Sequence, residues 1–152
     1  MAGDARVLIV EDQDMLRVVL FTVLRHQPLA VDTAATGAEA LERVESCDYA
    51  LILLDLDLPD GESVEFLTKF RASRPEATSF VLAVRDPGKE VDLGAAKVNA
   101  ILNKPLEIDT LAEIVRECAL VVPAPPDPVH HCPPAESEIT EQMDHGGSML
   151  TN

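Results

Sequence analysis

The chain has 152 residues, a formal net charge of −15 at pH 7 and three cysteines. This length suits one domain with its own apolar core, without help from disulfides or a structural metal. The acidic excess argues against nucleic acid or an anionic membrane as a direct partner, because such binding needs Lys and Arg to neutralise phosphates. The apolar runs are too short to cross a bilayer and the first residues do not resemble a signal peptide, so we expect a soluble, cytoplasmic protein.

Strands and helices alternate along the first 120 residues. Short apolar runs predict strands at residues 6–10, 30–34, 49–54, 80–84 and 100–102. Helical patterns between and after them predict helices at residues 13–26, 38–46, 64–70, 90–97 and 108–120. Parallel strands need crossover connections, and the helices supply them. We therefore predict an α/β fold, a doubly wound five-stranded parallel sheet with five helices.

The composition changes after Val122. The last 30 residues contain six of the 11 prolines, five acidic residues and no Lys or Arg. Such a segment buries too little apolar surface to offset its ordering entropy. We therefore divide the chain into a domain at residues 1–122 and a Pro-rich acidic tail at residues 123–152, which we expect to be disordered.

The cysteines give little indication of chemistry. Cys47, Cys118 and Cys132 are widely spaced and form no CxxC pair, which indicates neither a disulfide framework nor a zinc site. We expect two core thiols and one thiol in the tail. His130, His131 and Cys132 are adjacent, but neighbouring ligands on a Pro-flanked segment make a poorly preorganised metal site.

Ionisable residues follow three of the predicted strands. Glu11 and Asp12 follow the first strand, Asp55 and Asp57 the third, and Lys104 the fifth. Ligand sites of open parallel sheets lie at the carboxyl ends of the strands, so we expect these residues to converge. Crowded carboxylates repel one another, and a hard cation such as Mg²⁺ relieves that repulsion. One carboxylate can then act as a nucleophile towards a phosphoryl group, with the ammonium group stabilising charge.

Three segments carry a family resemblance. VLIVEDQD, LILLDLDLPDG and NKP resemble the receiver domain of bacterial two-component response regulators, over roughly residues 5–120. The resemblance implies a flavodoxin-like fold in which Asp55 is phosphorylated by a histidine kinase or phosphotransfer protein. Lys104 would contact the phosphoryl group, and the bond from Lys104 to Pro105 would be cis.

The resemblance also implies a Mg²⁺ site. Asp12 and Asp55 would bind the ion directly, and Glu11 would act mostly through water. Asp57 would contribute its backbone carbonyl, which makes its side chain less important. A plainer interpretation of the acidic pair is that Asp12 or Asp14 serves as a helix N-cap.

Two positions depart from the family pattern. Receivers usually place Thr or Ser at the end of the fourth strand, where its hydroxyl meets the phosphoryl oxygen. Here the aligned residue is Ala83, or Val84 if the register shifts by one, and neither donates a hydrogen bond. The aromatic residue that usually moves with this hydroxyl is replaced by Ile101. Either the signal takes another route, such as residues 85–89, or the switch is weak; Arg85 reaching the site is a further alternative.

Our functional expectation is a stand-alone receiver, not an enzyme, that signals through a protein partner. We expect the partner, or a second copy in a homodimer, to bind the face formed by residues 100–120. One alternative is a receiver-like module that works without phosphorylation. The other is a small phosphatase with Asp55 and Asp57 as its DxD motif, although such enzymes carry that motif on the first strand. The cognate kinase and the downstream target are not identified by the sequence.

Overall fold

A parallel five-stranded sheet forms the centre of the protein, with strand order β2-β1-β3-β4-β5. We describe it from a computed structural model, which covers residues 5–94 and 96–139. The strands are β1 (Ala5–Val10), β2 (Leu29–Ala34), β3 (Leu51–Asp55), β4 (Phe80–Arg85) and β5 (Ala100–Asn103). The α-helices are α1 (Asp14–Leu24), α2 (Gly37–Ser46), α3 (Glu62–Ser73) and α4 (Ile108–Leu120), and a 3-10 helix, η1 (Pro59–Gly61), precedes α3. The predicted α/β class and parallel sheet are confirmed.

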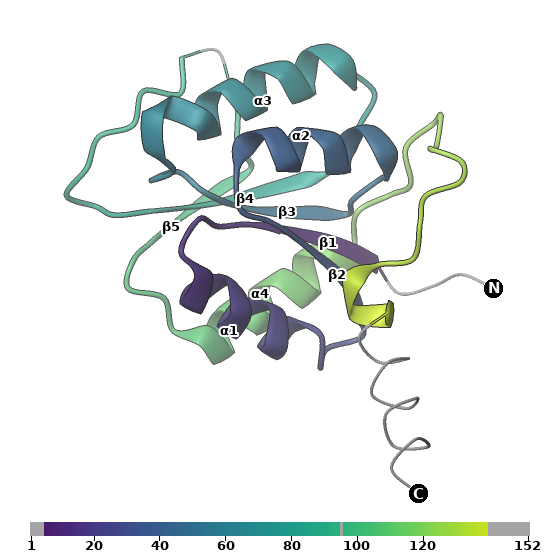
Figure 1. Ribbon diagram of the computed structural model, residues 1–152, viewed down its shortest axis with the longest axis horizontal. Coiled ribbons are helices and arrows are strands. Elements are labelled where there is room, and N and C mark those ends of the chain that lie inside the picture. The colour runs from purple at the N-terminus through teal and green to yellow at the C-terminus, as the bar shows by residue number, and fades with distance from the viewer. Residues whose placement is uncertain (1–4, 95, 140–152) are drawn as a thin grey trace, which may run out of the picture.

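The helices form two layers. Figure 1 shows α2 and α3 on one face of the sheet and α1 and α4 on the other. Each face has its own apolar cluster, with Phe66 and Phe70 of α3 packed on one side and Leu20 and Leu111 on the other. All five residues of β3 are buried, as expected of a central parallel strand covered on both faces. This buried central strand places Asp55 at the carboxyl edge of the sheet.

Local sequence signals account for the start of α2 and for its close approach to α3. The Thr36 side chain accepts a hydrogen bond from the N–H of Glu39, which caps α2. Gly37 lies so close to the backbone of Glu62 that an added Cβ would stand 2.9 Å from its carbonyl oxygen. Glycine at this position therefore allows α2 and α3 to approach each other.

No helix among the described residues is long and apolar enough to span a membrane.

The helix predicted at residues 90–97 is not present in the described part of that segment, so this prediction was wrong. The connection from β4 to β5 is instead an irregular loop. The Asp92 side chain accepts a hydrogen bond from the N–H of Gly94, whose φ of +56° lies in the left-handed region. Such local bonds compete with helix formation. Val91, Leu93 and Val98 still pack on the apolar cluster beside α3, so the loop covers that face without a helix.

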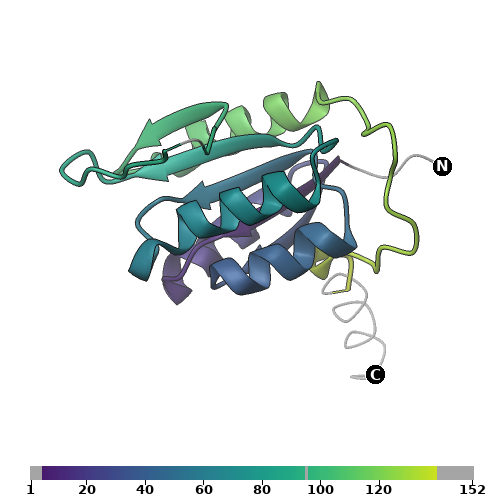
Figure 2. The same cartoon turned by 90° about the horizontal axis from the view of Figure 1, so that it is seen from above.

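The chain beyond α4 packs against the domain over its described part, in contrast to the disorder expected from composition. Figure 2 shows residues 121–135 running along one end of the sheet, from the end of α4 past α2. The Pro123 carbonyl accepts a hydrogen bond from Thr78, and the N–H of Val129 donates to Asp48. Residues 140–152 of the predicted tail lie outside the described residues.

A disulfide joins Cys47 to Cys132, so the expectation that the cysteines are unpaired thiols was wrong for these two. The bond spans 85 positions of sequence, and spacing alone does not reveal such a pairing. It also removes Cys132 from the suggested His-His-Cys metal cluster. Cys118 is free and half-buried.

Candidate functional site

Three carboxylates meet at the carboxyl edge of the sheet. One carboxylate oxygen from each of Glu11, Asp12 and Asp55 lies within 4.8 Å of the others. Strands β1 and β3 are neighbours, with Val10 opposite Leu54, so the residues that follow them converge. The order of strands reverses between β1 and β3, which is where open parallel sheets bind ligands. Glu11 and Asp55 are buried, whereas Asp12 is exposed.

Lys104 supplies the positive charge of the site. Its Nζ lies 3.0 Å from Asp55 Oδ1 and 3.1 Å from Asp57 Oδ2. Burial by itself lowers the pKa of Lys104, but the hydrogen bonds and charges of the two aspartates outweigh burial and raise the pKa overall. The ammonium group is therefore charged at neutral pH. The Lys104-Pro105 peptide bond is cis, as the resemblance implied.

The Asp57 side chain has more contacts than the sequence indicated. Besides Lys104, its Oδ2 accepts a hydrogen bond of 2.8 Å from the N–H of Asp86, the first residue after β4. Its backbone N–H donates to Asp55 Oδ1 at 2.9 Å. Asp57 thus links the Asp55 carboxylate to the start of the loop between β4 and β5.

Glu11 is the most perturbed acid of the cluster. Burial, partly offset by the hydrogen bond from the N–H of Gln13 and reinforced by the neighbouring Asp55 and Asp12, raises the pKa of Glu11 to about 8. A buried carboxyl beside two others resists ionisation because like charges repel in a poorly solvated site. Glu11 therefore keeps its proton at neutral pH.

These groups fit a hard divalent cation. The donors are carboxylate oxygens, which Mg²⁺ prefers, and they cluster within reach of one ion. Asp57 Oδ1 is also buried without a hydrogen-bond partner among the described residues, and so has unused acceptor capacity next to the cluster.

The sheet register decides which β4 residue faces the site. Asp55 lies opposite Val84, and Leu54 lies opposite Ala83. In-register residues of neighbouring parallel strands point to the same face, so Val84 stands beside Asp55. Ile101 lies opposite Ala83 and is 39% exposed. A valine therefore stands next to Asp55 on β4.

The structure also shows the contacts of Arg85 and the N-cap of α1. Arg85 contacts Asn103 on β5, with Nε 3.4 Å from Oδ1. The N-cap of α1 is Gln13, with no side-chain hydrogen bond, so neither Asp12 nor Asp14 caps this helix. One contact had no sequence signal: the Ser63 hydroxyl donates a 2.6 Å hydrogen bond to the Asp55 carbonyl and anchors α3 to the end of β3.

The chain is similar to known receivers over most of its length. The family model described as "Response regulator receiver domain" matches residues 7–116. The transcriptional regulatory protein PmrA of Pectobacterium parmentieri is 33% identical over 115 residues, which is 73% of this chain and 50% of that protein. CutR of Streptomyces coelicolor, also a transcriptional regulatory protein, is 33% identical over 80% of this chain and 57% of its own length. The chain thus spans about half the length of the curated relatives it matches.

Solved structures agree with the sequence relatives. A CheY-like receiver domain from Methanospirillum hungatei superposes with a TM-score of 0.67 at 27% identity, covering 77% of this chain and 94% of that one. The response regulator TrrA of Thermotoga maritima, crystallised with Mg²⁺ and BeF, gives a TM-score of 0.63 at 25% identity, covering 75% of this chain and 98% of that one. Fold, site geometry and comparisons agree, and the chain belongs to the response regulator receiver domain family of two-component phosphorylation signalling.

Proposed function

We propose that this chain accepts a phosphoryl group on Asp55 from a histidine kinase or phosphotransfer protein. The observation that carries the proposal is the position of Asp55, a buried carboxylate between Lys104 and the acidic pair Glu11 and Asp12. A nucleophilic carboxylate needs a positive group nearby and a second means of offsetting the charge of the incoming phosphoryl oxygens. Lys104 provides the first, and the acidic pair suits a cation that provides the second.

The Asp55 carboxylate would attack phosphorus, so that an O–P bond forms as the P–N bond of a phosphohistidine donor breaks. The donor imidazole leaves with the electron pair of that bond. Lys104, now shared between Asp55 and Asp57, would turn its ammonium group towards the phosphoryl oxygens. Ser63 holds the backbone of Asp55 in place through the carbonyl oxygen.

Asp12, Asp55 and the Asp57 backbone carbonyl would hold Mg²⁺, with Glu11 acting mostly through water. The ion, when bound, would neutralise charge on the transferred phosphoryl group. The same carboxylates repel one another without it, so ion binding and phosphorylation should depend on each other.

Incubation with acetyl phosphate and Mg²⁺ followed by intact-mass measurement tests the proposal. We expect one added phosphoryl group on the wild type, none on Asp55→Asn, and a full signal on Asp60→Asn. Asp60 is a matched control because it is an exposed aspartate on the same connection, and asparagine tolerates its φ of 57°. Unchanged labelling of Asp55→Asn, or no labelling of the wild type, would contradict the proposal.

The signal, we propose, leaves through a protein partner on the face formed by residues 100–120, either in a single copy or in a homodimer. Leu102, Leu106, Leu111 and Ile114 line a shallow cavity of about 160 Å³ there. The net charge of −15 disfavours a nucleic acid target. Amide exchange that stays the same on this face after phosphorylation would argue against it.

A second candidate is a receiver-like module that acts without phosphorylation. Val84 beside Asp55 and Ile101 on β5 favour it, because neither side chain can report on a phosphoryl group through a hydrogen bond. The acetyl phosphate experiment separates the two candidates, since a module of this kind would gain no mass.

A further inference from the structure

The segment of residues 132–139, here called the C-terminal strap, covers the outer edge of β2. The N–H of Val31 donates to Ser137 Oγ at 2.8 Å, and the N–H of Thr33 donates to Glu136 Oε1 at 2.8 Å. β2 is an edge strand of the sheet, so these donors face outward, away from β1. Side chains of the strap thus occupy hydrogen-bonding positions that a neighbouring strand would otherwise fill.

The strap also completes the surroundings of a buried charge. Asp32 is fully buried on β2, and its Oδ2 accepts hydrogen bonds from Arg6 Nη2 and the Tyr49 hydroxyl, both at 2.6 Å. Its Oδ1 accepts a 2.8 Å bond from the N–H of Glu136 in the strap. Burial, followed by the hydrogen bond and charge of Asp32, raises the pKa of Tyr49, so its hydroxyl stays protonated as a donor. Docking of the strap therefore supplies a partner that a buried carboxylate needs.

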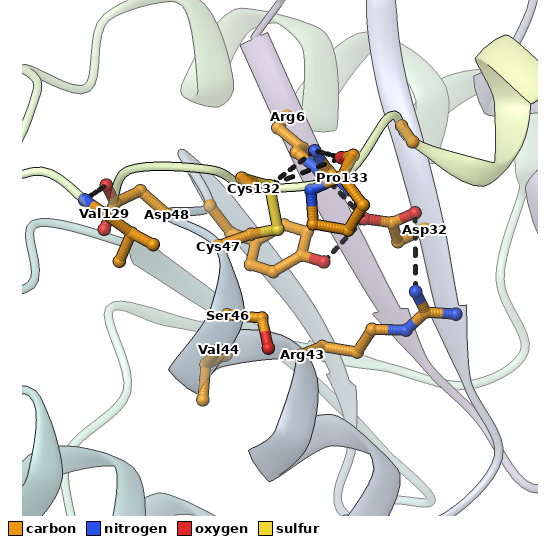
Figure 3. The surroundings of a disulfide bond; sticks show 12 residues. Arg6, Asp32, Arg43, Val44, Ser46, Cys47, Asp48, Val129, Cys132 and Pro133 are labelled. Carbon is orange, nitrogen blue, oxygen red and sulfur yellow. Dashed lines mark hydrogen bonds and ion pairs between the residues drawn. A yellow bond between two sulfur atoms is a disulfide. The ribbon is translucent and has the colours of Figure 1, made fainter.

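The Cys47–Cys132 disulfide is the covalent attachment of the strap (Figure 3). Cys47 is the C-cap of α2 and is 3% exposed, whereas Cys132 is partly exposed at the start of the strap. Arg6 Nη1 lies 2.7 Å from Cys132 Sγ and 2.6 Å from the Pro133 carbonyl oxygen. The guanidinium that binds Asp32 therefore also touches the sulfur and the backbone of the strap.

This arrangement favours reaction at Cys132. Thiol–disulfide exchange requires access to one sulfur, which the partly exposed Cys132 offers, and the nearby positive charge of Arg6 stabilises the Cys132 thiolate when it leaves in the second step. The noncovalent contacts of the strap lie at the sheet edge and centre on Glu136 and Ser137, whereas the five strands pair with one another without it. Breaking the bond should therefore loosen the strap and leave the domain folded.

We propose that Cys47 and Cys132 form a redox-cleavable clasp that controls whether the strap covers the edge of β2. A dithiol would attack Cys132 Sγ, breaking the S–S bond and releasing the Cys47 thiolate, which takes up a proton. The second thiol of the reductant then displaces Cys132, so that the protein gains two thiols and the dithiol is oxidised to its disulfide. The outward N–H groups of Val31 and Thr33 become accessible when the strap leaves. The site lies away from Asp55 and does not depend on the phosphorylation proposal.

Native-state reduction with dithiothreitol tests the clasp. Iodoacetamide should modify at most one cysteine, Cys118, in the untreated protein and up to three after reduction. Amide hydrogen exchange by NMR should then show Val31 and Thr33 exchanging at least about tenfold faster, which is about 1.4 kcal/mol of lost protection. The amides of Ile9 and Leu53, in the central strands, should keep their protection and so report an intact domain.

Matched variants separate loss of the clasp from general damage. The double variant Cys47→Ser with Cys132→Ser should show the fast exchange without reductant, and Cys118→Ser should behave as the oxidised wild type. Three outcomes would each overturn the proposal: modification of Cys47 and Cys132 without reductant, resistance of the bond to dithiothreitol in the folded protein, or unchanged exchange of Val31 and Thr33 after reduction.

Discussion

Replacement of Glu11 by Gln should change how the stability of the domain depends on pH. Burial first, with the charges of Asp55 and Asp12 added to it, raises the pKa of Glu11 from 4.5 to about 8. The folded protein consequently keeps the Glu11 proton at neutral pH, whereas the unfolded chain releases it. The Glu11→Gln substitution would preserve the shape of the side chain and the acceptor for the N–H of Gln13 without a titrating group.

The sign follows from proton linkage. Between pH 4.5 and about 8 the folded state binds more protons than the unfolded state, so the free energy of unfolding falls as pH rises. The stabilisation from the protonated form is fully present below pH 4.5 and is lost by about pH 8. A pKa shift of one unit corresponds to about 1.4 kcal/mol, so the shift of Glu11 sets an upper bound of about 5 kcal/mol on the change in the free energy of unfolding. Because Asp12 is exposed and water reaches the cluster, we expect about 2 to 3 kcal/mol.

Urea unfolding from about pH 5 to about pH 9 in EDTA measures the effect. As pH rises, the free energy of unfolding of Glu11→Gln should increase by about 2 to 3 kcal/mol relative to that of the wild type. Glu65→Gln is the control, because the hydrogen bond and charge of Lys69 lower the pKa of the exposed Glu65. A constant difference between Glu11→Gln and the wild type at every pH would refute the reasoning. Excess Mg²⁺ should flatten the wild-type curve if the ion binds at the cluster.

Two further substitutions test the core network and the sheet register. Arg6→Ala leaves Asp32 fully buried without its closest cation. We expect chemical denaturation to show that the free energy of unfolding falls by about 3 kcal/mol. A fall of less than about 1 kcal/mol would mean that Arg6 is not the main partner of Asp32. Val84→Thr places a hydroxyl beside Asp55. Because one hydrogen bond to the phosphoryl group contributes about 1 kcal/mol, we expect roughly fivefold more phosphorylated protein at steady state with acetyl phosphate. Ala83→Ser is its control, and an equal gain in both variants would contradict the register.

Much of the fold and site could be predicted because it depends on local patterns. Apolar runs that end in charged residues predicted the strands. The carboxyl ends of parallel strands lie at one edge of the sheet whatever connections join the strands. Glu11, Asp12, Asp55 and Lys104 therefore converge as expected. The helix expected at residues 90–97 failed because apolar spacing says nothing of the turn that Asp92 and Gly94 form locally.

The α/β class, the parallel sheet and the acidic residues at its carboxyl edge could be predicted from the sequence, because the periods of strands and helices are visible in neighbouring residues. The folded structure was needed to show that Val84 stands beside Asp55, that Lys104 is shared with Asp57, and that Cys132 pairs with Cys47. Register, shared ion pairs and disulfides join positions distant in the sequence. Their formation depends on the path of the folded chain, which composition and spacing do not encode.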